Sequence, residues 1–229
     1  MVRVMDSSTI EAALHTAEHS VAEGGQLAGT GFWQVVTAVK TDPDLIDRHA
    51  DRIAAIDQAA FQSWALLKVP LGIGTALMVL ATGAGLALVA AAYFTKDLVA
   101  IATFYAGFGL LLTTTHGLGH LVVGRLLGIR FTHWFVGTLA RPQPGVKIDY
   151  SSYLRTPATS RAWMHAAGAV ATKLVPFALL GAAAAADLPD WAVWGLAVIG
   201  VATVVTDIVW STKSSDWMKF RREMAFDQS

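Results

Sequence analysis

Most of the chain consists of long apolar runs separated by short polar segments. Residues 69–95 hold no charged side chain and lie between Lys68 and Lys96. This run exceeds the roughly 20 residues that an α-helix needs to cross the hydrocarbon core of a bilayer. Three more runs of this kind follow, at about residues 98–124, 162–186 and 191–210. The pattern predicts four transmembrane helices, of which the third contains Lys173 and the fourth Asp207.

Residues 1–64 are more polar, and their apolar positions recur at helical spacing. Thr41-Asp42-Pro43-Asp44 has the composition of a turn followed by the start of a helix. The apolar residues that follow share one helix face: Ile46, Ile53, Ile56 and Phe61. We expect two or three amphipathic helices outside the bilayer, as an N-terminal extension of a membrane domain formed by residues 65–229.

Between the second and third apolar runs, residues 129–154 alternate with the period of a β-strand. Two alternating stretches, residues 131–136 and 146–150, are separated by Arg141-Pro142-Gln143-Pro144-Gly145. Proline and glycine between two such stretches favour a turn. The segment therefore predicts a small cytosolic β-hairpin, inserted into an otherwise all-α polytopic membrane protein.

This hairpin suggests two roles. An exposed strand edge at residues 132–137 or 146–150 can pair with an extended segment of a transmembrane protein or peptide. Alternatively, Phe131, Trp134 and Phe135 anchor the hairpin at the membrane–water interface, where aromatic rings are enriched. The alternation of side chains is compatible with both roles.

The composition agrees with a membrane protein surrounded by lipid. Hydrophobic residues make up 54% of the 229 residues and charged residues 15%, whereas soluble domains carry about 25% charged residues. The mean hydropathy is +0.49. A formal net charge of zero gives no reason to expect nucleic acid as a partner. Because there is no cysteine, any metal ion has to be held by His, Asp or Glu.

Lysine and arginine indicate the orientation of the predicted spans. They are frequent in the N-terminal region, in the segment between the second and third spans, and in the C-terminal tail. The two short turns, at residues 96–97 and 187–190, hold a single basic residue. Because basic segments stay in the cytosol, four spans place both termini there. We expect an integral protein of a prokaryotic plasma membrane.

A histidine pair lies inside the second predicted span. His116 and His120 are one helical turn apart, so both imidazoles can reach one metal ion. His116 is nine positions before Arg125, which places it roughly 13 Å inside the span at ~1.5 Å per residue. Ionisable groups are costly at this depth and indicate function by default. Two neutral histidines bonded to neighbouring helices are the alternative, and the metal-like spacing favours a metal site.

The surrounding residues resemble a known family. The stretch Thr114-Thr115-His116-Gly117-Leu118-Gly119-His120 resembles the H-E-x-x-H motif of the site-2 protease family of intramembrane zinc metalloproteases. His165-Ala166-Ala167-Gly168-Ala169-Val170-Ala171-Thr172 resembles the A-G-P-x-x-N motif of that family, and Ser215-Asp216-Trp217-Met218-Lys219-Phe220 resembles its L-D-G-G-R-I segment. Asp207 falls near the asparagine of the N-x-x-P element, and the hairpin matches the cytosolic β-insertion. The resemblance covers about residues 98–224.

The resemblance implies a Zn²⁺ ion held by two histidines and one carboxylate. The motifs place His116 and His120 as the first two ligands and Asp216 as the third, with Asp207 as the alternative carboxylate. Such a site keeps an open coordination position, as catalytic zinc sites do.

Several positions depart from the family pattern. Gly117 stands where the family has its catalytic glutamate, which takes a proton from metal-bound water. No proline follows Gly168, Thr172 replaces the asparagine, and Trp217 replaces the first glycine after the aspartate. A zinc site can survive these changes, but the proton transfer that the glutamate supplies is missing.

Two charged residues in the spans could contribute to catalysis. Asp207 is the candidate substitute base, and Lys173 can polarise a carbonyl group. The favoured alternative is an ion pair between the two, because each charge needs a partner inside a membrane.

The remaining histidines are weaker candidates. His133 and His165 are each expected to be structural and hydrogen-bonded rather than metal ligands. His15-Thr16-Ala17-Glu18-His19 matches the inverted zinc motif H-x-x-E-H, but its polar surroundings favour a solvated helix face.

Four functions are compatible with these features. The first is a site-2-protease-like metalloprotein whose peptidase activity is altered or lost. The second is an active intramembrane zinc metalloprotease with a non-standard base. The third is a non-catalytic membrane scaffold for transmembrane partners. The fourth, ranked lowest, is another metal-dependent membrane enzyme acting on a lipid-soluble small molecule. Metal analysis separates the third from the others, and a peptide-cleavage assay separates the first two.

Overall fold

The computed structural model of the protein describes residues 5–139, 144–209 and 215–226. Helices dominate the described part of the chain. In chain order they are α1 (Ser7–Ala22), α2 (Phe32–Val39), α3 (Pro43–Trp64), α4 (Leu71–Ala91), the short 3₁₀ helix η1 (Ala92–Phe94), α5 (Asp97–Leu126), α6 (Tyr150–Arg155), α7 (Ala158–Ala185), α8 (Asp190–Val209) and α9 (Asp216–Met224). Three strands, β1 (Leu67–Pro70), β2 (Phe131–Val136) and β3 (Pro144–Ile148), form a small sheet.

The N-terminal region forms three helices, which confirms the prediction of two or three. The side chain of Asp42 accepts hydrogen bonds from the backbone N–H groups of Asp44 and Leu45, so it caps α3. The apolar faces of α1, α2 and α3 meet in one buried cluster, which also includes Leu154 of α6. Burial of these faces holds the three helices together and docks them on the rest of the chain.

Four helices are long and apolar enough to cross a membrane: α4 with η1, α5, α7, and α8 as far as Asp207. Their outward faces carry exposed large apolar side chains, such as Leu80, which is 69% exposed. Such faces are unfavourable in water and suit a lipid environment. The helices match the four predicted spans, apart from Trp210, which lies outside the described residues.

Small residues allow these helices to approach each other closely. A Cβ atom at Gly107 of α5 would lie 2.5 Å from the carbonyl oxygen of Gly85 in α4. On the same pair of helices, the hydroxyl of Thr82 donates a hydrogen bond to that of Thr114 at 2.9 Å. Close approach and hydroxyl pairing are typical of helix packing in lipid. They hold α5, the helix of the histidine pair, against α4.

The predicted hairpin is present, but its surroundings differ from the prediction. The sheet has the antiparallel order β1-β2-β3, so β2 is paired on both sides. The expected exposed edge at residues 132–137 is therefore wrong, whereas the alternative at residues 146–150 falls partly on β3, an edge strand of the described sheet. The strand β1 lies partly inside the apolar run of residues 69–95, and α6 occupies the end of the predicted hairpin segment. Residues 140–143 of the connecting turn lie outside the described part of the chain.

The expectation of an aromatic interfacial anchor is also wrong for two of its three residues. Phe131 and Trp134 are 7% and 5% exposed and belong to a buried cluster with Leu121 of α5 and Met164 of α7. Phe135 is half-buried. The sheet therefore packs onto the long apolar helices α5 and α7 through Phe131 and Trp134, which were expected to face the membrane interface.

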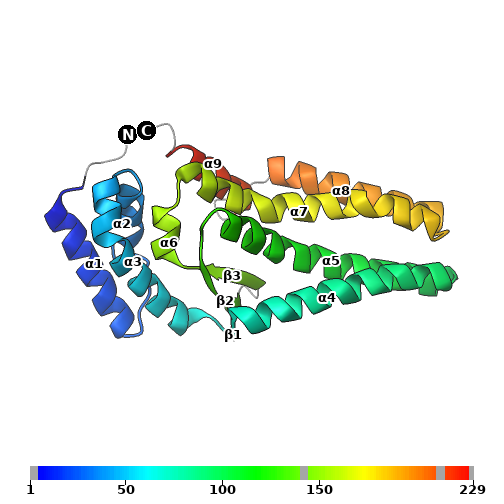
Figure 1. Cartoon of the computed structure of the whole chain (residues 1–229), viewed down its shortest axis with the longest axis horizontal. Coiled ribbons are helices and arrows are strands. Elements are labelled where there is room, and N and C mark those ends of the chain that lie inside the picture. The colour runs from blue at the N-terminus through cyan, green and yellow to red at the C-terminus, as the bar shows by residue number, and fades with distance from the viewer. Residues whose placement is uncertain (1–4, 140–143, 210–214, 227–229) are drawn as a thin grey trace.

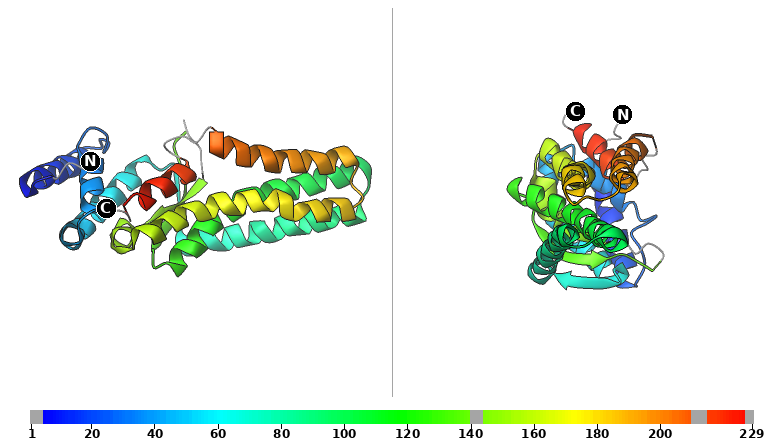
Figure 2. Two further views of the ribbon diagram at one scale, coloured as in Figure 1. Left: turned by 90° about the horizontal axis from the view of Figure 1, so that it is seen from above. Right: turned by 90° about the vertical axis from the view of Figure 1, so that its right-hand side faces the viewer.

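The molecule is elongated, and its polar parts gather at one end. Figure 1 shows the sheet, α6, α9 and the N-terminal helices beside the same end of the long helices, with both termini there. The turns between α4 and α5 and between α7 and α8 lie at the opposite end, as the left view of Figure 2 also shows. This arrangement matches the one-sided distribution of basic residues along the chain.

Candidate metal centre

Three side chains from two distant parts of the chain converge at the polar end of the long helices. α5 presents His116 and His120, and α9 presents Asp216. The Oδ2 atom of Asp216 lies 3.3 Å from Nε2 of His116 and 3.2 Å from Nε2 of His120. The ligand atoms of the three residues all lie within 4.8 Å of one another. In the described part of the chain, this is the group of His, Asp and Glu side chains that can hold a metal ion.

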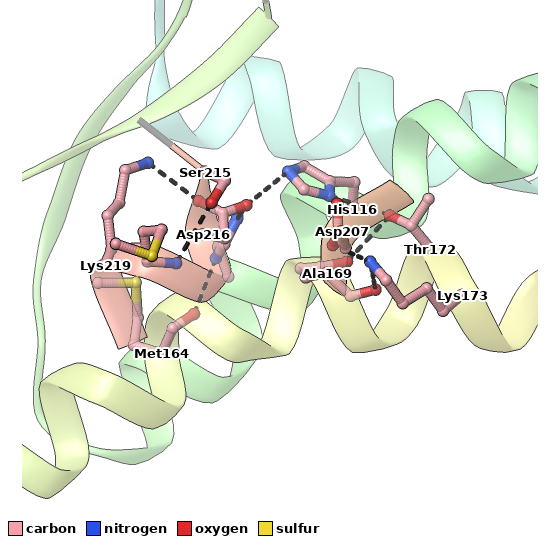
Figure 3. A network of polar contacts seen from close by, with 12 residues as sticks. His116, Met164, Ala169, Thr172, Lys173, Asp207, Ser215, Asp216 and Lys219 are labelled. Atoms are coloured by element: carbon pink, nitrogen blue, oxygen red, sulfur yellow. Dashed lines mark hydrogen bonds and ion pairs between the residues drawn. The ribbon is translucent and has the colours of Figure 1, made fainter. Parts of the chain in front are cut away.

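Both imidazoles are oriented by hydrogen bonds through Nδ1, on the side away from Asp216. Nδ1 of His120 lies 2.8 Å from the backbone carbonyl oxygen of Met164, which can only accept. Nδ1 of His116 lies 2.9 Å from Oγ1 of Thr172, whose proton is donated to the carbonyl of Gly168. We infer that both Nδ1 atoms carry the ring proton; Figure 3 shows the side chains of His116 and Thr172 next to each other. Such contacts are typical of the groups that orient metal-binding histidines.

These tautomers leave three lone pairs facing one another. In the neutral histidines, Nε2 is bare when Nδ1 carries the proton. Oδ2 of an ionised Asp216 is also an acceptor, so no proton stands between the three atoms. Three acceptors at 3.2–3.3 Å repel one another unless a cation lies among them. Either a metal ion or an additional proton on an imidazole satisfies this requirement, and the spacing of the three ligands suits a metal ion.

The start of α9 prepares Asp216 as a ligand. The side chain of Ser215 accepts a hydrogen bond from the backbone N–H of Met218, so α9 begins at Asp216. A carboxylate in the first turn of a helix is stabilised by the positive end of the helix dipole. Nζ of Lys219 donates to Oδ1 at 2.9 Å, which leaves Oδ2 for the histidines. Figure 3 shows this arrangement.

Asp216 is ionised in this setting. Burial by itself raises the pKa of the Asp216 carboxyl, but hydrogen bonds from Nε2–H of His116 and His120, which form when the imidazoles carry the additional proton, outweigh it together with the charge of Lys219. The net result is a pKa well below its ordinary value. An ionised carboxylate is the form that binds a metal ion.

Gly168 makes room for the site. A Cβ atom at this position in α7 would lie 2.3 Å from Nε2 of His120. Any larger residue would displace the ligand ring, so the glycine is required by the position of His120. The sequence motif around Gly168 identified this position without showing its neighbour.

Gly117 does not lie beside an empty space. A Cβ atom at Gly117 would lie 2.5 Å and 2.8 Å from Cζ3 and Cη2 of Trp134 in β2. The same indole covers Gly74 of α4, where a Cβ atom would lie 2.3 Å from its Cδ1. Its Nε1 donates a hydrogen bond to Oγ1 of Thr75 at 3.0 Å. Trp134 thus fills the position from which a glutamate would extend.

Asp207 and Lys173 form an ion pair with each other. Nζ of Lys173 also lies 3.4 Å from the carbonyl oxygen of Ala169 in its own helix. The structure brings Asp216 to the histidines, while the carboxylate of Asp207 is turned to Lys173 (Figure 3). This is the arrangement that the requirement for charge pairing in a membrane predicted.

The other histidines lie elsewhere. Nε2 of His165 is hydrogen-bonded to the hydroxyl of Tyr153 at 2.9 Å, and His133 packs beside the ring of Phe61 with 5.8 Å between centroids. His19 on α1 pairs with the exposed Glu23 at 3.1 Å. None of them belongs to the cluster of His116, His120 and Asp216 in the described structure.

Three contributors to the site were not identified as such from the sequence: the hydroxyl of Thr172, the carbonyl of Met164 and the ammonium group of Lys219. A backbone carbonyl gives no sequence signal, because every residue has one. Thr172 did have a signal, since it stands where the resembled motif has an asparagine. Both asparagine and threonine can accept a hydrogen bond from an imidazole.

Comparisons with protein-family models, with curated proteins and with solved structures give no match for this chain.

Proposed function

We propose that the protein is an integral membrane metalloprotein that holds one divalent ion, Zn²⁺, with His116, His120 and Asp216. The observation that carries this proposal is the convergence of three acceptor atoms, Nε2, Nε2 and Oδ2, at 3.2–3.3 Å. The hydrogen bonds at Nδ1 leave no ring proton to separate these atoms. A divalent cation neutralises the carboxylate and accepts all three lone pairs at once.

The donor set fits zinc. Zn²⁺ binds imidazole nitrogen and carboxylate oxygen, and three protein ligands leave one position open in a tetrahedral site. His116 is 41% exposed, so the site is not sealed on that side. When bound, the ion supplies Lewis acidity to a group at the open position. The protein itself supplies the three ligands. Thr172 and Met164 orient the imidazoles, and the ammonium group of Lys219 holds the other carboxylate oxygen of Asp216.

The metal site has the plan of a site-2 protease without its general base. The proposed relationship rests on the histidine pair in one membrane-type helix, the glycine of the next motif beside His120, and the later carboxylate. The base position at Gly117 is filled by Trp134, and each glutamate of the chain lies outside the four long helices. We therefore propose that peptidase activity is altered or lost. Because Trp134 fills the base position, the second candidate function is that of a non-catalytic membrane scaffold for transmembrane partners.

The four long apolar helices are proposed to span a prokaryotic plasma membrane, with both termini in the cytosol. The positive-inside distribution of lysine and arginine supports this orientation. Lipid then surrounds α4, α5, α7 and α8, and a transmembrane protein or peptide is the kind of partner that can reach the site.

Metal content tests the proposal most directly. Protein purified without chelators is analysed for all first-row metals by mass spectrometry, as wild type and as His120→Ala. We expect about one zinc per wild-type chain and a loss of stoichiometric metal in the variant, because two ligands rarely retain zinc. His19→Ala, which removes an exposed histidine outside the site, is the control and retains the metal. Wild-type protein free of metal contradicts the proposal.

A cleavage assay separates the two catalytic alternatives. A membrane-embedded peptide is incubated with the zinc-loaded wild type and with His120→Ala. Cleavage that depends on His120 contradicts the proposed loss of activity and favours a peptidase with a non-standard base. Metal-free protein that captures transmembrane peptides favours the scaffold.

A further inference from the structure

The helix that carries Asp216 is held at its other end by a buried charge. Glu223 is 0% exposed and lies seven residues after Asp216 in α9. Seven residues are about two turns of an α-helix, so both carboxylates lie on the same side of α9, roughly 10 Å apart along its axis. Glu223 is also the buried residue that α9 contributes to the protein. A contact at Glu223 therefore restricts both the rotation and the axial position of Asp216.

Two cations from different parts of the chain meet Glu223. Nζ of Lys40 lies 2.5 Å from Oε1, and Nε of Arg161 lies 2.8 Å from Oε2. Arg161 in α7 donates a further hydrogen bond to the carbonyl of Thr156 at 2.7 Å. Lys40 stands at the C-terminal end of α2, and its ammonium group also lies 4.9 Å from the centroid of the Tyr153 ring. Thus the N-terminal helices contact α9 through a charge that is itself almost fully buried.

The charges at this junction depend on one another. Burial alone raises the pKa of Glu223, but Lys40 and Arg161 outweigh it and the pKa lies below its ordinary value. Without Lys40, Oε1 of the buried Glu223 loses its hydrogen-bond donor, and a buried acceptor without a partner is unfavourable. Arg161 still balances the charge of the carboxylate, so the main loss is the link between the N-terminal helices and α9, which lets α9 shift.

We propose that Lys40 is a positioning residue for the metal site, and that docking of the N-terminal helices sets the metal affinity by holding α9 through Glu223. The inference rests on the proposed function, because it assigns a control to the same site. The route runs from Lys40 of the N-terminal helices to Glu223, along two turns of α9, and to the Oδ2 atom of Asp216. Arg161 holds Glu223 from the α7 side, which also carries Met164 and Thr172.

Zinc affinity of Lys40→Met tests the route. The dissociation constant for Zn²⁺ is measured by competition with a chelator in full-length protein. Groups that orient metal ligands typically change metal affinity by 10–100-fold when removed, and we expect a weakening of about tenfold. Glu223→Gln, which keeps the size of the side chain and removes its charge, is expected to act in the same direction and serves if Lys40→Met fails to fold.

A second buried ion pair provides the matched control. Lys147 of β3 and Asp57 of α3 also join the N-terminal helices to the rest of the chain, and their side chains are 10% and 9% exposed. The contacts described for the Lys147 side chain are with Asp57 and with the rings of Phe61 and Tyr150, and none of these residues belongs to α9. Lys147→Met is therefore expected to lower thermal stability while the zinc affinity stays that of the wild type. An equal loss of affinity in Lys147→Met means general loosening of the junction and overturns the route through Glu223.

Two further measurements test whether Lys40 positions Asp216 or only stabilises the fold. They also distinguish failure of this inference from failure of the proposed metal-binding function. Co²⁺ bound in place of zinc reports its ligands by absorption, and we expect the tetrahedral bands of Lys40→Met to weaken as Asp216 withdraws. Hydrogen exchange of metal-free protein should show faster exchange of α9 amides in Lys40→Met than in wild type. If the wild type binds no metal, the proposed function fails, and exchange in α9 still tests whether Lys40 holds this helix. Unchanged affinity or unchanged α9 exchange in a folded Lys40→Met overturns the inference.

Discussion

At the scale of single residues, the contact between Gly117 and Trp134 decides what chemistry the histidine pair can support. A motif shows only that glutamate is missing, whereas the structure shows what stands in its place. The indole is fixed on two sides, by Gly74 and Gly117, and by its hydrogen bond to Thr75. A large side chain occupies this position, so introducing a carboxylate there requires more than one substitution.

Gly117→Ala is expected to destabilise the protein. Alanine favours a helix by ~1 kcal/mol over glycine, but its Cβ atom would lie 2.5 Å from the Trp134 ring. Overpacking of this kind typically costs ~1–3 kcal/mol, so the clash outweighs the helix propensity. The control is Gly109→Ala in the same helix, where a Cβ atom meets nothing within 4 Å. Thermal unfolding in detergent should place Gly117→Ala below wild type and Gly109→Ala at or above it.

Gly117→Glu is expected to produce an even less stable protein without peptidase activity, because the Trp134 ring lies across the path of the new side chain. The double variant Gly117→Glu/Trp134→Ala removes that obstacle. Cleavage of a membrane-embedded peptide and thermal stability are measured for both variants with and without zinc. Cleavage by the single variant contradicts the conclusion that Trp134 blocks the base position.

At the scale of elements, the pairing of α7 with α8 and the position of α9 determine which aspartate lies against the histidine pair. Lys173 holds Asp207 to α7, and Ser215 starts α9 at the residue that meets the histidines. Both carboxylates lie close to the end of the long helices, but their helices present them to different partners. The distinction between them is therefore a property of helix packing.

Substitution of each aspartate tests this distinction. Asp216→Asn is expected to lose stoichiometric metal, because it removes a charged ligand. Asp207→Asn is expected to keep the metal and to lower thermal stability, since it leaves Lys173 without its partner in a membrane. Adding Lys173→Met to Asp207→Asn removes the unpaired charge and should restore part of that stability. Loss of metal in Asp207→Asn with retention in Asp216→Asn would reverse the assignment.

The docking of α3 on α6 should depend on acid pH. Hydrogen bonds from Arg155 and then Ser151 lower the pKa of Asp51 from 3.8 to about 2. Since the folded pKa is below the unfolded value, the contribution to stability is present above pH 3.8 and is lost as the pH falls toward 2. We expect Asp51→Asn to remove this part of the acid dependence in thermal unfolding, and the exposed Asp47→Asn on the same helix to retain it. The effect should be small, because Asp51 is exposed to solvent.

At the scale of the whole molecule, the long helices, the sheet and the N-terminal helices form one continuous structure. Two buried ion pairs, Lys40 with Glu223 and Lys147 with Asp57, connect the N-terminal helices to α9 and to β3. The cluster of His116, His120 and Asp216 lies between the long apolar helices and the polar part of the molecule (Figure 1). The proposed control of metal affinity through α9 depends on this connection.

The proposed membrane orientation rests on this asymmetry and can be measured. Reporter fusions at Lys96 and Asp187, which lie at the turns remote from the termini, are expected to read as external. Fusions at the two termini are expected to read as cytosolic, because the basic segments gather at that end. A cytosolic reading at Lys96 or Asp187 would contradict the four-span orientation.

Much of the architecture was available from the sequence because it depends on local patterns. The length of an apolar run determines whether a helix can cross a bilayer, and the period of apolar positions distinguishes helix from strand. The spacing of His116 and His120 likewise places both rings on one helix face, whatever surrounds them. These features determined four apolar helices, N-terminal amphipathic helices, a hairpin and a candidate pair of ligands.

The tertiary structure alone decided which distant groups meet. Three contacts join residues far apart in the chain. They are the pairing of β1 with β2, the packing of the Trp134 indole on Gly117, and the ion pair of Lys40 with Glu223. No local period records such contacts, since they depend on how closely whole helices and strands approach. The choice of Asp216 over Asp207 has the same origin. Both lie near polar positions of the resembled motifs, but only Asp216 is brought to the two Nε2 atoms, by the packing of α9 on α7.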